Sequence, residues 1–426
     1  MTALHLSTII SRSSTAILSH ISHLAKSFPN HPLLFTLSHN TPSTDDLSDI
    51  VGKLTNFSSQ SIGCLSAPLP GPHSSFTACS LAIFDPRNAV MFRSTIPGRQ
   101  QAQVGRWRPV GQKVMEEEQS SWRDDRLVDV EDWEDVWNSA TGIRKLPEEL
   151  EGLRDISSII YLTDHAPEGL SGSISQFSNS SKVGLVASST PFVTGRPFTL
   201  FRNQNIYDSG AVGIALRRSR IPSSNDFTTK ISFAGLSPIS KPMTVTQCEG
   251  NMVISLDDQN PTQFLLSCIR ESGLNMDSTF KDDASFLLGV VDNGKLGQVY
   301  NITAGDPSRG TISLDTERSP AQGATVQFLH RAKSLGDPLS EQGMLFAPYS
   351  LIGEPLSIPR SLNLFSVSDH GSRWQGDDFA APEAFILNDT FMAASENGFL
   401  FTPKQREPVD AWTCTVPGAL VTLECI

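Results

Sequence analysis

KVGLVASSTPFVTGRPFTLFRNQNIYDSGAVGIALRR, residues 182–218, is the stretch that decides the fold. It begins with an apolar run of strand length, Val183 to Val186, and continues with the small residues Ala187 to Thr190. Apolar runs of this length are typical of buried strands. Small side chains at the end of such a strand leave backbone amides open, so we predict a binding spot there.

The second half of the same stretch predicts a hairpin. Phe198 to Phe201 and Ala211 to Arg217 are two further β-forming runs, and Asn203-Gln204-Asn205 lies between them. Asparagine tolerates the positive φ that tight hairpin turns require. Gly210 and Gly213 flank or interrupt the second run, which indicates a bulge or a close approach of two backbones.

The same pattern occurs earlier, in SIGCLSAP at residues 61–68, followed by the β-rich FTACSLAIF at 76–84. An internal duplication would explain two strands that end in small residues, and chance similarity between two short runs is the alternative. We expect both strand ends to lie in one N-terminal domain and to line a shared concavity. The candidate ligand-binding residues are Gly63, Cys64, Ser66, Ser188, Ser189 and Thr190.

Composition restricts the class of protein. The chain has 426 residues and a net charge of −12, which argues against a nucleic-acid-binding surface. No apolar run approaches the ~20 residues of a membrane span, and no secretory signal is recognisable. The six cysteines show neither a CxxC pair nor the dense spacing of a disulfide framework, so reduced thiols and a cytoplasmic location are expected.

The N-terminus has two interpretations. The first 44 residues contain no aspartate or glutamate and are rich in serine, as a mitochondrial transit peptide would be. Ile10, Ile17, Ile21 and Leu24 also lie on one helical stripe, and residues 33–37 follow as a strand. We favour the first helix and strand of the fold, and mitochondrial targeting remains the alternative.

The chain in order predicts an α+β protein: two mixed α/β domains whose β-sheets are flanked by helices. A strand at 33–38, a helix with Thr44 as N-cap and a strand at 61–65 form a β-α-β unit. The charged, serine-rich stretch at 219–226 predicts a domain boundary. In the second domain, two β runs surround Glu249-Gly250-Asn251, and a helix begins near Pro261.

Residues 98–150 interrupt this pattern and form an acidic insertion that holds four of the six tryptophans. Trp133 and Trp137 share one face of a helix-like stretch. Such a segment predicts either a docking site for a protein partner or an element that packs on its own domain.

Catalytic signatures are absent from the sequence, including GxGxxG, the phosphate-binding loop, HExxH and GxSxG. Three weaker candidates were weighed, and for each the structural interpretation is favoured. Asp164, His165 and Ser171 could form a nucleophilic triad, and Cys64 could be a reactive thiol. A late loop holds potential metal ligands, which are Asp369, His370, Asp377 and Asp378. His20 and His23 lack a third ligand, so no metal and no cofactor is assigned.

The order of these pieces resembles the FIST domain, named for F-box and intracellular signal transduction proteins. SIGCLSAP looks like the family's strand with Gly-Cys and small residues, and VGLVASS with NIYDSGAVGIAL looks like the end of its N-terminal half. SPISKPMTVTQCEGNMVISLDDQNPTQFL, residues 237–265, resembles the opening of its C-terminal half. ENGFLF at 396–401 corresponds to its end. The resemblance covers residues 5–424.

The resemblance implies two domains, an N-terminal FIST-like part at 1–222 and a C-terminal FIST-like part at 227–426. It implies an intracellular sensory, ligand-binding or adaptor protein without catalytic residues, and an amino acid or related metabolite as ligand. No segment before residue 5 is long enough for an F-box, so a ubiquitin-ligase role is not implied. The alternative function is an enzyme that uses the pocket cysteine or the late Asp/His loop.

Overall fold

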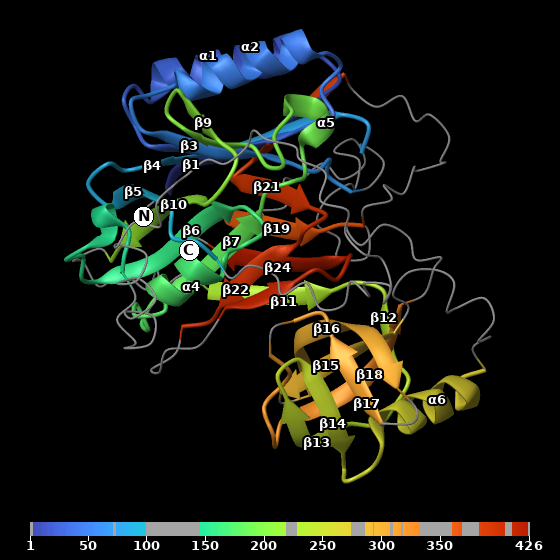
Figure 1. The fold of residues 1–426 in the computed structure, drawn as a ribbon. Helices are drawn as coiled ribbons and strands as arrows, with labels where there is room; N and C mark the ends of the chain where they lie inside the picture. Colours follow the sequence, from blue (N-terminus) through green and yellow to red (C-terminus); the bar gives the residue numbers. More distant parts are fainter. Residues whose placement is uncertain are drawn as a thin grey trace, which may run out of the picture.

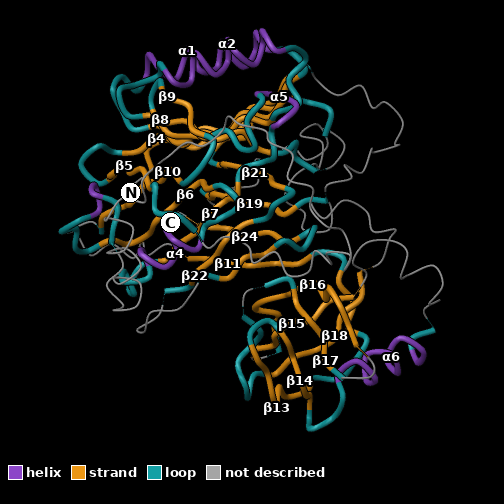
Figure 2. Tube along the Cα trace, viewed as in Figure 1, coloured by secondary structure: helices purple, strands orange, loops and turns teal. Residues whose placement is uncertain are grey.

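The computed structural model describes residues 3–70, 74–98, 145–218, 228–273, 286–292, 294–306, 310–316, 318–331, 360–368, 383–404 and 411–424. Strands predominate and helices are few (Figures 1 and 2). The helices are α1 (Ser14–Ser27), α2 (Thr44–Thr55), the short 3-10 helix η1 (Glu148–Leu150), α4 (Glu168–Ile174), α5 (Pro191–Thr194) and α6 (Pro261–Glu271). The α+β class is therefore correct, but helical cover is sparser than predicted.

The strands form four sheets. The first sheet has the order β20 (Ala384–Asn388), β1 (Ala3–Ser11), β4 (Thr77–Phe84), β2 (Leu33–Ser38), β3 (Ser61–Ser66), β8 (Leu200–Arg202) and β9 (Asn205–Tyr207). The second has the order β23 (Trp412–Cys414), β22 (Phe399–Thr402), β7 (Ser181–Val186), β6 (Ile156–Thr163), β10 (Ala211–Arg217) and β5 (Ala89–Ser94).

The third sheet has the order β11 (Thr228–Phe233), β24 (Ala419–Glu424), β19 (Ser361–Ser366) and β21 (Thr390–Ser395). The fourth has the order β12 (Leu236–Pro238), β18 (Thr325–Arg331), β13 (Met243–Glu249), β14 (Met252–Leu256), β17 (Thr311–Leu314), β16 (Lys295–Asp306) and β15 (Phe286–Asp292). Because β15 also pairs with β18, this sheet closes into a small barrel, which Figure 1 shows beside the other three sheets.

One four-strand motif occurs three times. In each copy the first strand pairs antiparallel with the fourth, the fourth antiparallel with the second, and the second parallel with the third. The copies are β1-β4-β2-β3, β5-β10-β6-β7 and β11-β24-β19-β21. The duplication expected from the first two copies is thus part of a triplication. In the third copy the small barrel lies between the first and second strands.

The three motifs surround a common apolar core. Leu34 of the first motif, Ile160 of the second and Leu364 of the third belong to one buried cluster, which continues into the barrel through Tyr300. The opposite faces have separate clusters, one under α1 and α2 and one under α4. Every strand of a motif presents alternate residues to these two sides. Because both sides are apolar, the strands are continuous hydrophobic runs in the sequence.

Local sequence explains the helices. In α1, Ile17, Ile21 and Leu24 recur at helical spacing and are all buried. In α2, the Ser43 hydroxyl accepts a hydrogen bond from the Asp46 amide (3.1 Å), so Ser43 is the N-cap and not Thr44 as predicted. α6 begins at Pro261 as expected, with Asn260 as its cap.

Two further sequence-based expectations were wrong. Residues 3–11 are strand β1, so Ile10 lies on a strand and not on the first helix. The hairpin that follows residue 200 joins β8 to β9, with Asn203 at φ 53°, whereas β10 belongs to the second sheet. The periodic pattern identified the β-forming runs, but pairing partners depend on packing that a local pattern does not contain.

The predicted boundary at 222–227 lies between β10 and β11. Strands after this boundary pair with strands before it, β20 with β1 and β22 with β7. The division into two domains at this position stays a prediction. The insertion at 98–150 lies mostly outside the described residues. None of the helices described is long and apolar enough to cross a membrane.

Candidate functional site

The third strands of the three motifs, β3, β7 and β21, end at one place. The Ser188 amide donates to the Leu65 carbonyl (3.1 Å), and the Ala67 amide donates to the Ala394 carbonyl (2.8 Å). These bonds tie the end of β7 to β3 and the end of β3 to β21. The two small-residue strand ends lie side by side, and the third motif adds its own strand end to them. The shared concavity lined by their small side chains stays a prediction.

Glu396, the residue directly after β21, brings a carboxylate to this meeting point. Its Oε2 accepts a hydrogen bond from the Ser188 hydroxyl (2.8 Å) and its Oε1 accepts one from the Ser189 amide (2.6 Å). The small residues after β7 leave the Ser189 amide free to donate, as the sequence predicted, and the Ser188 hydroxyl adds a second donor. A carboxylate held by short bonds to neutral donors is fixed in place without being neutralised.

Asn397 completes this arrangement. Its side-chain Nδ2 lies within hydrogen-bond distance of the Ala187 carbonyl (2.9 Å), the Ser189 hydroxyl (3.3 Å) and Oε1 of Glu396 (3.2 Å), so that its two N–H groups serve three acceptors and one of them is shared. Because the Ala187 carbonyl can only accept, the amide orientation is fixed and Oδ1 must point away from these partners. Sequence reasoning missed Glu396 and Asn397 as site residues, and ENGFLF at 396–401 was their only signal.

Glu396 and Asn397 line a cleft of about 1800 Å³. Its wall also includes His165, which follows β6, Leu400 of β22 and Tyr300 of the barrel. Small-molecule sites usually measure roughly 300–1,000 Å³, so one small ligand would occupy only part of this space. The part beside Glu396 is where polar groups of two motifs converge.

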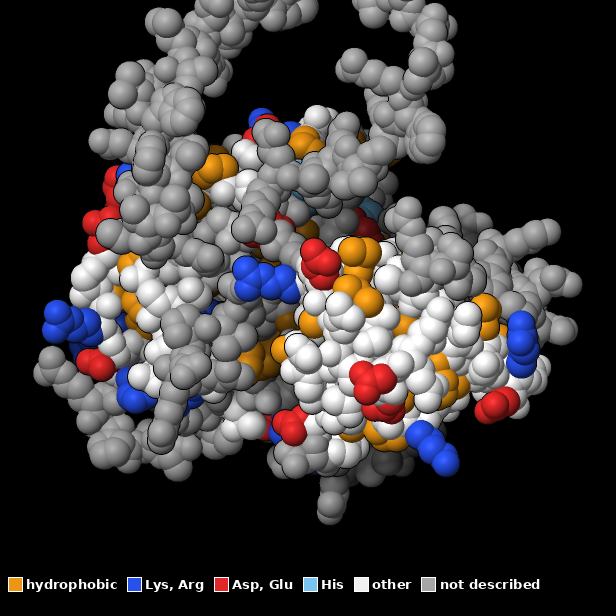
Figure 3. Space-filling model, turned by 60° about the horizontal axis from the view of Figure 1, so that its bottom comes forward, with side chains coloured by type: hydrophobic (Ala, Val, Ile, Leu, Met, Phe, Trp, Pro, Cys, Tyr) orange, Lys and Arg blue, Asp and Glu red, His pale blue; other side chains and the backbone are white. Residues whose placement is uncertain are grey.

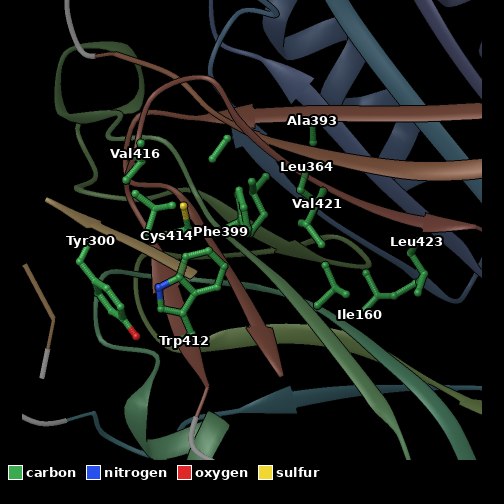
Figure 4. Close-up of a cluster of buried hydrophobic side chains, with 14 of the residues drawn as sticks. Ile160, Tyr300, Leu364, Ala393, Phe399, Trp412, Cys414, Val416, Val421 and Leu423 are labelled. Carbon is green, nitrogen blue, oxygen red and sulfur yellow. The ribbon is translucent and has the colours of Figure 1, made fainter. Parts of the chain in front are cut away.

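An aromatic cluster at the same cleft joins the barrel to the second sheet. Trp412 contacts Tyr300 of the barrel (ring centroids 6.3 Å apart) and Phe399 of β22 (6.1 Å), as Figure 4 shows. Phe399 follows Glu396 by three residues and pairs with Leu185 of β7. The turn that carries Glu396 therefore leads within three residues into β22 and its contact with Trp412.

The six predicted site residues differ in their surroundings. Gly63 lies against the ring of Phe35, where an added Cβ would be 2.5 Å from ring atoms. Cys64 and Ser66 are buried at the end of β3, and Thr190 is buried among threonine hydroxyls, 2.7 Å from Oγ1 of Thr199. Ser188 and Ser189 are the two that contact the Glu396 carboxylate. The role of the six in ligand binding stays a prediction.

Cys64 lies in an environment that suppresses thiol reactivity. Burial raises the pKa of the Cys64 thiol, and the nearby Glu396 carboxylate raises it further. Since the thiolate is the nucleophile, this environment disfavours covalent chemistry at neutral pH. The side chain is fully buried, as expected for a structural cysteine.

The candidate triad of Asp164, His165 and Ser171 does not form. Asp164 accepts hydrogen bonds from the backbone amides of Ala166 (2.9 Å) and Gly210 (2.6 Å), which hold a turn. The His165 ring stacks on Phe198 with 5.4 Å between ring centroids, and the Ser171 hydroxyl donates to the Glu168 carbonyl (3.2 Å). Each of the three residues has a local structural partner.

The remaining metal candidates can be placed only in part. Asp369, His370, Asp377 and Asp378 lie outside the described residues. The His20 Nε2 is 3.0 Å from the Ser7 hydroxyl, which is also 2.9 Å from Nε2 of His5. In the part of the chain that the structure describes, no group of three histidine, cysteine or acidic residues could hold a metal ion.

Surface charge on the described residues is mixed. On the face shown in Figure 3, basic and acidic side chains are interspersed among polar and apolar ones.

Comparison with known proteins places the chain in a family. A family model described as the FIST N domain matches residues 33–259, more than half of the chain, so the protein belongs to the FIST family. FIST domains are associated with signal transduction. The match extends from β2 through the first two motifs into β14 of the barrel. No curated protein sequence and no solved structure matches the chain.

Proposed function

We propose that the protein is an intracellular FIST-type sensory module that binds a small ligand where the three motifs meet, and that it does not act as an enzyme. The observation that carries this proposal is the anchored Glu396 carboxylate at the ends of β3, β7 and β21. A polar group fixed by neighbouring strands and open to a cleft is the usual form of a binding site for a small molecule.

The chemistry of the neighbouring side chains also favours binding over catalysis. A nucleophile needs access to its substrate as well as a base within hydrogen-bond reach. The Ser188 hydroxyl has the Glu396 carboxylate at 2.8 Å, but its side chain is fully buried, and burial raises the pKa of the Cys64 thiol. These groups fix a carboxylate in place, and the resemblance to the family adds an amino acid or related metabolite as the expected ligand class.

A sensory protein must pass ligand occupancy to a partner. The backbone that carries Glu396 continues to Phe399, which contacts Trp412 and through it the barrel. A change at the strand ends would reach the barrel by this contact. The insertion at 98–150 is the proposed docking segment for a protein partner, and this part of the proposal rests on its tryptophan-rich composition.

Native mass spectrometry of the full-length protein tests the proposal. We expect the wild-type protein to retain a small molecule after gentle purification. Ser189→Trp should abolish retention because Ser189 is exposed beside Glu396 and the indole would fill the site. Ser59→Trp, an exposed position at the opposite end of β3, is the matched control and should retain the ligand. Retention that survives Ser189→Trp would place the ligand elsewhere.

A further inference from the structure

The hydrogen bonds around Glu396 restrict what the site can hold, provided that the proposed binding function is correct. A carboxylate offers about four lone-pair positions. Oε1 already accepts two hydrogen bonds, from Ser189 N (2.6 Å) and Asn397 Nδ2 (3.2 Å), and Oε2 accepts one, from the Ser188 hydroxyl (2.8 Å). Only Oε2 therefore keeps an acceptor position for a ligand.

In the part of the chain that the structure describes, the negative charge of this carboxylate has no cationic partner. Within the described residues, no lysine or arginine forms an ion pair with Glu396, and all of its polar contacts are to neutral donors. Neutral donors lower the cost of desolvation but leave the net charge in place. A ligand that carries a positive charge would be stabilised here in a way that a neutral one would not.

Asn397 supplies a second acceptor. Its Nδ2 is committed to Ala187 O (2.9 Å), Ser189 Oγ (3.3 Å) and Glu396, so its Oδ1 is the atom left for a ligand. Asn397 lies next to Glu396 in the chain, and both residues line the cleft. One free lone pair on Oε2 and one amide oxygen form a pair of acceptors, and the exposed Ser189 hydroxyl beside them accepts from Asn397 Nδ2.

We propose that this site binds the ammonium group of an alkylamine, with Glu396 Oε2 and Asn397 Oδ1 as its acceptors. An ammonium ion has several N–H donors around one centre, so it can bind two separate acceptors. A guanidinium group prefers two free oxygens of one carboxylate in parallel, and here Oε1 is already occupied. The occupied lone pairs thus select an ammonium ion over a guanidinium ion.

Binding of three matched probes tests this selectivity. The probes are 4-fluorobenzylammonium, 4-fluorobenzylguanidinium and 4-fluorobenzyl alcohol, followed by fluorine NMR on the full-length protein. We expect the ammonium probe to bind most tightly. Glu396→Gln keeps the shape of the side chain and removes its charge, and it should weaken ammonium binding by at least about tenfold. Thermal unfolding of the variant checks that it is folded.

Glu148→Gln is the control, because Glu148 lines the same cleft and is exposed but does not contact the Glu396 group. It should leave the affinity for the ammonium probe unchanged. Equal binding of the ammonium and guanidinium probes, or equal loss in both variants, would overturn the ammonium assignment.

The outcomes also separate this inference from the proposed function. If the wild-type protein retains a molecule that Ser189→Trp displaces, and no ammonium probe competes with it, the sensory function stands and the ammonium assignment fails. If no molecule is retained and no probe binds, both fail.

Discussion

Phe35 covers Gly63 so closely that a Cβ on that glycine would lie 2.5 Å from the ring. The second motif repeats this contact with Tyr161 over Gly184, also at 2.5 Å, and in both motifs the two residues are register partners of parallel strands. The glycine in each third strand is therefore a packing requirement shared by the two copies. The missing side chain of the glycine leaves room for a large ring on the outer face of the sheet.

Gly63→Ala should destabilise the protein by roughly 1–3 kcal/mol, the usual cost of overpacking a core. Chemical denaturation measures the change in the free energy of unfolding. Gly52→Ala is the control, because nothing lies within 4 Å of the Cβ that it would add and the position is helical. It should stabilise the protein by roughly 0.5–1 kcal/mol. Neutral behaviour of Gly63→Ala would show that the ring can move aside.

Cys64 should resist alkylation in the native protein, because burial and the Glu396 carboxylate both raise the pKa of its thiol. Among the five cysteines that the structure describes, Cys248 is partly exposed and should be labelled first. Timed labelling with iodoacetamide and peptide mass spectrometry gives the order, and urea-unfolded protein provides the fully labelled reference. Fast labelling of Cys64 would revive the enzyme alternative.

The stability of the protein should fall as the pH drops through the range set by His20. Burial lowers the pKa of His20 to about 4 from the usual 6.5, with smaller contributions from His5 and His23. The unfolded chain therefore binds a proton below pH 6.5 that the folded protein takes up only near pH 4. The contribution of His20 to stability is complete above pH 6.5 and decreases as pH falls toward 4.

Urea unfolding at pH 7, 6 and 5 measures this dependence. His20→Gln preserves a polar group near Ser7 and removes the titration, so its free energy of unfolding should change less with pH than that of the wild-type protein. His23→Gln, exposed on the same helix, is the control. An unchanged pH dependence in His20→Gln would show that other groups cause it.

Removal of residues 1–27 should abolish cooperative unfolding. β1 lies between β20 and β4, and Leu6, Ile9 and Ile10 are buried. Each such side chain contributes ~1.5–3 kcal/mol on burial, against a typical total stability of about 5–15 kcal/mol. Deleting residues 1–2 alone is the control. Sequencing of the native N-terminus tests the mitochondrial alternative, since a start beyond about Ser27 would remove β1.

Local sequence was sufficient for several of the elements and for two of the strand ends. Apolar runs predicted β3 and β7, helical spacing predicted α2 and α6, and the small residues after β7 predicted open backbone amides, of which the Ser189 amide is one. These features depend on neighbours within a few positions of the chain, so periodicity and turn chemistry report them directly.

Tertiary structure decided the rest. The carboxylate that accepts from Ser188 belongs to Glu396, 208 positions later in the chain. The third motif was hidden because the barrel separates β11 from β19, so its strands are not consecutive in sequence. Which strands pair depends on how apolar faces fit around a common core, and no local pattern encodes that fit. The sequence alone therefore determined the open backbone amide of the site, and only packing of the third motif against the other two supplied its acceptor.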